Sequence, residues 1–193
     1  MSVPSMPPPL PSARPAPRSM FVNVMAWLSL ALGLLGVISG LLQAAVFASL
    51  DLGNQLAAGL EQGGAQALLP PQLLWVFQHL QLINGLSTLA ALVTTVVSWG
   101  LWQRREWGRV GFIALLLLSA ALGIAFSVWM AGVMDTLLKQ AAGDPALVDP
   151  MVGQMLAMYK TTLYVGSLVI ALLHGGLAWK LHTPEIRAEF EPA

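Results

Sequence analysis

The stretch WGLWQRREWGR, from Trp99 to Arg109, decides the fold class because it lies between two long apolar segments, 73–102 and 110–134. Each of these segments exceeds the ~20 apolar residues that are needed to cross the ~30 Å hydrocarbon layer of a bilayer. Three of the chain's nine lysines and arginines fall within the stretch: Arg104, Arg105 and Arg109. A short basic segment between two such blocks predicts a tight turn at one face of a membrane.

Two further apolar blocks, 21–50 and 155–181, complete the pattern. The whole chain is 56% hydrophobic and 9% charged, whereas a soluble domain carries roughly 25% charged residues. Backbone polar groups cannot go unpaired in lipid, so the four blocks must be helices. We therefore predict an all-α, polytopic membrane protein whose four transmembrane helices occupy residues 20–182. A cleaved signal peptide is the alternative for the first block, which is longer than the ~15 apolar residues such peptides carry.

The distribution of basic residues predicts the orientation. In the four-span scheme only Lys139 and Lys160 fall on one side of the membrane. The other side holds Arg14, Arg18, Arg104, Arg105, Arg109, Lys180 and Arg187. The positive-inside rule then places both termini and the basic turn in the cytoplasm, and we expect a bacterial cytoplasmic (inner) membrane. The anionic leaflet would hold the arginines of the turn.

The two ends of the chain differ from the spans. Residues 1–19 contain seven of the thirteen prolines, which predicts a disordered cytoplasmic tail. Residues 183–193 begin with Thr183-Pro184, a typical helix start. Ile186 and Phe190 share one face of this segment, so we expect a short amphipathic tail on the inner membrane surface.

The segments that follow the first and third spans, 51–60 and 135–143, match in register at one Asp, two Ala and one Gly. Both are predicted to extend their helices beyond the membrane, with Asp135 and Lys139 as an i,i+4 ion pair. The match favours two similar in-out-in hairpins that arose by duplication. Chance similarity between alanine- and glycine-rich segments is the alternative.

Small residues recur at four-residue spacing in every predicted span, and such stripes let helix backbones approach closely in lipid. The stripes comprise Gly36 and Gly40, then Ser87, Ala91 and Thr95, then Ser119, Gly123 and Ser127, and finally Ser167, Ala171 and Gly175. We expect them to pack within one four-helix bundle. Oligomerisation through one stripe is the alternative.

His174 is the one ionisable residue placed deep in a predicted span. Thr94, Thr95 and Ser98 of the second span should lie at a similar depth, so we expect His174 to hydrogen-bond to one of these hydroxyls. Two interpretations stay open: a neutral histidine that serves packing, and a functional residue such as a proton relay.

No pattern in the sequence indicates catalysis. The chain has no cysteine, no spaced set of metal ligands, and none of the HExxH, P-loop or GxSxG motifs. We predict no catalytic, metal or cofactor-binding site and no cofactor, and the zero net charge gives no reason to expect nucleic acid. The lipid bilayer is the expected surrounding, with a second copy or another membrane protein as partner.

These observations favour a non-enzymatic membrane protein that acts as an interaction, assembly or structural component. A small oligomeric channel or transporter subunit is the first alternative. An intramembrane enzyme that uses His79 and a carboxylate on the outer side is the second.

The basic turn Gly100–Arg109 and the closing segment Thr183–Phe190 resemble those of small four-span bacterial inner-membrane proteins of unknown function. The resemblance implies the span architecture only, since no activity or site residues come with it.

Overall fold

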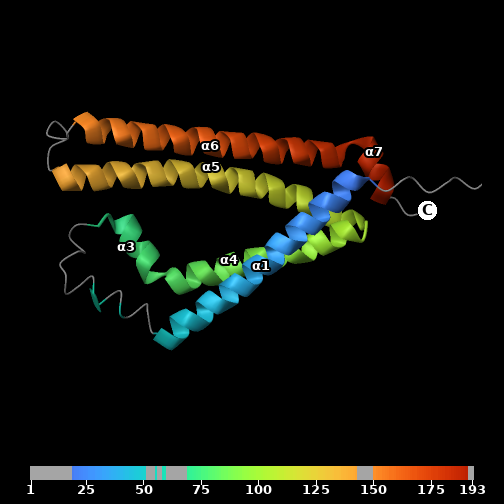
Figure 1. Cartoon of the computed structure of the whole chain (residues 1–193), viewed down its shortest axis with the longest axis horizontal. Helices are drawn as coiled ribbons and strands as arrows, with labels where there is room; N and C mark the ends of the chain where they lie inside the picture. The colour runs from blue at the N-terminus through green and yellow to red at the C-terminus, as the bar shows by residue number, and fades with distance from the viewer. Residues whose placement is uncertain (1–18, 51–54, 56–57, 60–68, 143–149, 191–193) are drawn as a thin grey trace, which may run out of the picture.

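The computed structural model describes residues 19–50, 55, 58–59, 69–142 and 150–190 (Figure 1). All of its regular elements in these ranges are helices: α1 (Met20–Leu50), α3 (Pro71–Gln78), α4 (Leu80–Trp102), α5 (Glu106–Ala142), α6 (Pro150–His182), α7 (Pro184–Arg187) and the 3-10 helix η3 (Ala188–Phe190). Among them α1, α4, α5 and α6 are long and apolar enough to cross a membrane. The predicted fold class, an all-α chain with four membrane-spanning helices, is confirmed.

The second apolar block differs from its prediction, because it is not one continuous helix. His79 has φ −116° and ψ 22°, and this residue separates α3 from α4. Its ring Nδ1 donates to the carbonyl of Trp75 at 2.8 Å, and the ring stacks on the Trp75 indole. The His79 side chain thus forms a hydrogen bond with a backbone carbonyl at the point where the helix breaks. The remaining 23 residues of α4 still span ~35 Å.

α5 and α6 begin before their predicted spans, at Glu106 and Pro150. α5 then continues to Ala142 without interruption, so it includes the segment that was predicted as its extension. The extension predicted at 51–60 lies outside the described residues, except for Gln55, Ala58 and Gly59. Asp135 forms an ion pair with Lys160 of α6 rather than the expected pair with Lys139.

The four long helices form two hairpins, α1 with α4 and α5 with α6 (Figure 1). We call the end at which residues 103–105 connect α4 to α5 the turn end, and the opposite end, with Leu50, α3, Ala142 and Pro150, the loop end. The two hairpins meet at the turn end and diverge toward the loop end. They therefore form a wedge rather than the closed four-helix bundle that the sequence predicts.

The α1–α4 hairpin is closely packed where the helices cross, and the glycines of α1 face α4. A Cβ added to Gly36 would lie 2.9 Å from the Cβ of Ala91. One added to Gly40 would lie 2.0 Å from the Thr88 Oγ1, and one added to Gly33 would lie 2.5 Å from the Thr95 Oγ1. Only a residue without a side chain allows these backbones to approach so closely.

The α5–α6 hairpin has no such close crossing at its glycines. A Cβ added to Gly123 or Gly175 would meet no other atom within 4 Å. Ser127 is buried, whereas Ser119 is exposed and Ser167 and Ala171 are half-buried. The expectation of a close helix crossing at Gly123 and Gly175 is therefore wrong, because no atom of another helix lies near either glycine.

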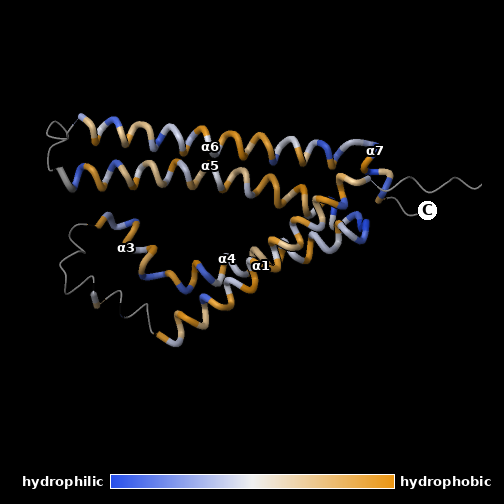
Figure 2. Tube along the Cα trace, viewed as in Figure 1, coloured by the Kyte–Doolittle hydropathy of each residue, from blue (hydrophilic) through white to orange (hydrophobic). Residues whose placement is uncertain are grey.

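The buried apolar core lies at the turn end, where all four helices and the chain end converge. It comprises Val22, Ala26, Leu101, Phe112, Leu116, Ala178, Leu181, Ile186 and Phe190. Figure 2 shows apolar positions along all four long helices and hydrophilic positions gathered around α7. Ile186 and Phe190 are 6% and 5% exposed, so the closing segment packs into the protein core and not onto the membrane surface as expected. Folding back into this core removes both side chains from water without a bilayer.

The connection between α4 and α5 is a Schellman turn. The amide of Arg105 donates to the Gly100 carbonyl, and the amide of Arg104 donates to the Leu101 carbonyl. Arg104 has φ 59°, a left-handed conformation that glycine usually adopts at this position. Gly108 then packs on the end of α4, because a Cβ there would lie 2.3 Å from the carbonyl carbon of Gly100.

Candidate functional site

The predicted intramembrane site around His174 is not assembled. His174 Nδ1 donates to the Ile170 carbonyl of its own helix at 2.7 Å. Thr94 and Thr95 donate to the Ala90 and Ala91 carbonyls, each at 2.9 Å. The expected bond between His174 and α4 is therefore wrong, because the hairpins diverge and each side chain uses a carbonyl one turn earlier in its own helix.

Ser98, the fourth residue of this predicted site, lies elsewhere. It is fully buried, and its hydroxyl has no hydrogen-bond partner among the described residues. The structure thus brings none of the three hydroxyl groups to His174.

The polar groups that do converge lie at the turn end, around Arg104. Its guanidinium forms an ion pair with Glu189 at 3.2 Å and donates to the Asn23 Oδ1 at 2.8 Å. Glu189 also accepts a hydrogen bond from the Ser19 amide at 3.1 Å. The guanidinium carbon lies 5.7 Å from the centre of the Phe190 ring. One arginine of the turn therefore connects the start of α1 to the end of the chain.

Arg109 connects the turn to α6 in a similar way. It is 4% exposed, forms an ion pair with Glu106 at 2.5 Å, and donates to the Leu181 carbonyl at 3.1 Å. Arg105 is exposed by contrast. The expectation that the membrane surface holds all three arginines is wrong for Arg104 and Arg109, whose side chains bond within the protein. The Arg109 guanidinium bonds to one of the last carbonyls of α6, and such carbonyls have no partner within their own helix.

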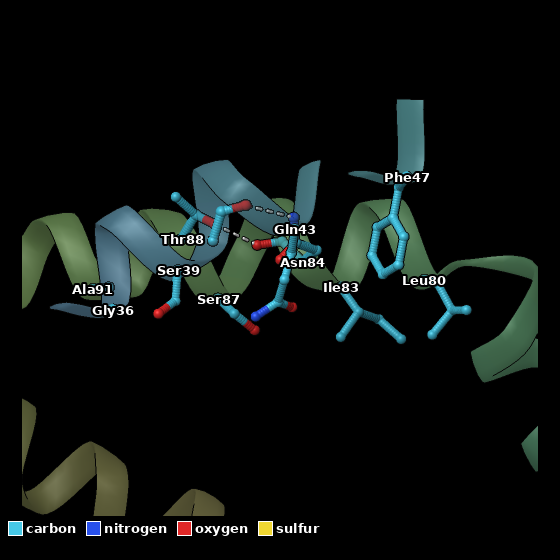
Figure 3. A pocket seen from close by; sticks show the side chains of 11 residues that line it. Gly36, Ser39, Gln43, Phe47, Leu80, Ile83, Asn84, Ser87, Thr88 and Ala91 are labelled. Atoms are coloured by element: carbon cyan, nitrogen blue, oxygen red, sulfur yellow. Dashed lines mark hydrogen bonds between the residues drawn. The ribbon is translucent and has the colours of Figure 1, made fainter. Parts of the chain in front are cut away.

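A second group of polar residues lies at the crossing of α1 and α4, in the loop-end half of the hairpin (Figure 3). They line a pocket of about 350 Å³. Asn84 is 9% exposed, and its Nδ2 donates to the Gly40 carbonyl at 3.1 Å. In Figure 3 Ser39 of α1 and Ser87 of α4 direct their hydroxyls to the same side of this pocket.

Sequence reasoning named Gly36, Gly40, Ser87 and Ala91 as packing residues but missed the pocket that they help to line. The signal available was the group of polar residues in the first half of the second apolar block, to which Asn84 belongs. Which residues of the first block they would face could not be read from spacing alone.

No group of three or more potential metal ligands occurs in the part of the chain that the structure describes. Of the carboxylates that the enzyme alternative could pair with His79, Asp51, Glu61, Asp144 and Asp149 lie outside the described residues. The fifth, Asp135, binds Lys160.

Comparison with known protein families, characterised proteins and solved structures finds no match to the chain. The architecture fits a small polytopic membrane protein.

Proposed function

We propose that this protein is a non-enzymatic, multi-pass component of a bacterial cytoplasmic membrane that acts in interaction or assembly, with both termini in the cytoplasm. The observation that carries the proposal is the divergence of the two hairpins from a shared core at the turn end (Figure 1). Helices in a bilayer associate through packing. A wedge between two hairpins offers a further helix two surfaces to pack against.

A second copy of the chain is the partner that we propose. The α1–α4 hairpin is closely packed by itself, since the glycines of α1 let its backbone approach α4 closely. It can therefore enter the wedge of another copy as a unit. Closed twofold dimers are the commonest assemblies, and two wedges can exchange hairpins about such an axis.

The channel alternative has less support. A channel needs a stripe of uncommitted polar groups that faces the axis of an oligomer, but of its candidates Thr94 and His174 bond to their own helices and Ser98 is fully buried.

Site-specific photo-crosslinking tests the proposal. A photoreactive amino acid is placed in turn at Leu86, Leu89, Leu92, Val93 and Val96, which are exposed positions around α4. Two copies with different tags are co-expressed, and adducts that carry both tags are quantified in native membranes. We expect crosslinked dimers from the positions on one face of α4 only, and a dimeric mass in mild detergent. A monomeric mass together with lipid adducts alone at every position would contradict the proposal.

A further inference from the structure

The pocket between α1 and α4 holds polar groups that form no hydrogen bond with any residue that the structure describes. The four long helices contain fourteen serine and threonine side chains, and eleven of these donate to a carbonyl of their own helix. Of the three others, Ser98 is buried elsewhere, whereas Ser39 and Ser87 both line this pocket. A hydrogen bond to a carbonyl of the same helix is the usual way in which a hydroxyl in an apolar helix is satisfied, and Ser39 and Ser87 lack this bond.

Two amides add to these hydroxyls. Gln43 lies one helical turn beyond Ser39, lines the same pocket, and forms no hydrogen bond with any described residue. Asn84 uses its Nδ2 for the Gly40 carbonyl, which leaves its Oδ1 as an acceptor. The pocket therefore presents donors and acceptors from Ser39, Gln43, Asn84 and Ser87.

The pocket lies at a depth in the membrane where polar groups without a hydrogen-bond partner have a high free-energy cost. Along α4, Ser87 and Asn84 lie roughly 18–22 Å from Trp99 near the turn end, which is within the ~30 Å hydrocarbon layer. In Figure 2 this half of α4 carries several hydrophilic positions. Hydrocarbon offers no partner for a hydroxyl or an amide, so a bound molecule that supplies one is favoured.

The lining also defines the chemistry of that molecule. No Asp, Glu, Lys, Arg or His is among the residues that line the pocket, so nothing balances a charged group there. Phe47, Leu80 and Ile83 form its apolar part. The volume of about 350 Å³ lies within the range of small-molecule sites.

We propose that this pocket binds the uncharged polar head of a membrane-dissolved amphiphile, a molecule with hydroxyl groups on an apolar chain. The hydroxyls bond to Ser39, Ser87, Gln43 and the Asn84 Oδ1, and the chain lies on Phe47 and Ile83. The inference does not rest on the assembly that we propose above, because α1 and α4 of one chain line the pocket.

The experiment uses a photoactivatable monoacylglycerol as the probe, in phosphatidylcholine vesicles that contain the full-length protein. We expect saturable labelling confined to the peptides around 36–47 and 80–91. Unlabelled monoacylglycerol and an alkylglycerol without the ester carbonyl should both compete. A fatty acid methyl ester, which lacks the hydroxyls, should compete poorly.

The variant Gln43→Leu/Ser87→Ala removes two of the polar groups, and about a tenfold loss of probe affinity is expected. The matched control is Thr94→Val/Ser167→Ala, whose hydroxyls bond to their own helices, and its affinity should be unchanged. Gln43 and Ser87 are exposed, so both double variants should fold and melt like the native protein.

Three results would overturn the proposal. One is labelling that does not saturate and spreads over all lipid-facing helices. Another is equal affinity for the native protein and Gln43→Leu/Ser87→Ala. The third is crosslinking of the pocket residues to another protein chain, which would assign the pocket to an assembly interface.

Discussion

Gly108→Ala should be the most damaging glycine-to-alanine substitution among the glycines that the structure describes. The new Cβ would lie 2.3 Å from the Gly100 carbonyl carbon and 2.4 Å from the Leu101 amide nitrogen, which are backbone atoms of α4. A backbone inside a helix cannot move aside as a flexible side chain can, so the start of α5 must shift away from α4. We expect a loss of about 3 kcal/mol or more in the free energy of unfolding, at the upper end of overpacking effects.

Gly123→Ala is the matched control, because it adds the same methyl group to the same helix where no other atom lies within 4 Å. Removing a glycine from a helix interior stabilises it by ~0.5–1 kcal/mol, so this variant should melt at or above the native temperature. Thermal and SDS-induced unfolding in detergent, followed by tryptophan fluorescence, measure both. If Gly108→Ala unfolded like the native protein, the close contact between α5 and α4 would be wrong.

Arg104→Ala should release the closing segment from the core. The substitution removes the ion pair with Glu189 and the hydrogen bond to Asn23, and it leaves a carboxylate that is only 6% exposed without its counter-charge. Breaking one side of a buried pair costs ~3 kcal/mol or more. We expect a lower melting temperature and faster proteolysis near residues 183–190.

Two further variants separate the loss of the Arg104 contacts from the loss of a positive charge in the turn and from the effect of the left-handed backbone. Arg105→Ala removes an exposed arginine from the same turn and should have little effect. Arg104→Gly also loses the side chain but relieves the left-handed backbone at φ 59°, so it should be ~1 kcal/mol less damaging than Arg104→Ala. Equal stability of Arg104→Ala and Arg105→Ala would show that the network around Arg104 does not hold the tail.

The sequence predicts the class of fold well, because hydrophobic length and the cost of unpaired backbone groups act locally. Four blocks of apolar residues lead directly to four spanning helices. Gly36 and Gly40 were recognised from their spacing, and they do lie at a helix crossing. Local patterns of this kind do not depend on how the helices are arranged in space.

The arrangement itself could not be predicted, and the errors share this cause. His174 was expected to reach α4, but contact between them depends on the angle between the hairpins. Arg104 and Arg109 were assigned to the membrane surface, because a run of arginines between two spans usually lies there. Only their long-range partners, Glu189 and the Leu181 carbonyl, reveal that they bond inside the protein.

The wedge formed by the two hairpins is the central feature of this account. Two distances between spin labels, measured by pulsed electron paramagnetic resonance, test it most directly. The chain contains no cysteine, so spin labels can be attached at chosen cysteines without background. One pair of labels, at Met20 of α1 and Trp179 of α6, lies at the turn end. The other pair, at Leu50 of α1 and Met155 of α6, lies at the loop end. All four positions are exposed. The account predicts a clearly longer distance for the loop-end pair than for the turn-end pair, in detergent and in lipid nanodiscs. Equal distances in both media would mean that the four helices form a closed bundle and would contradict it.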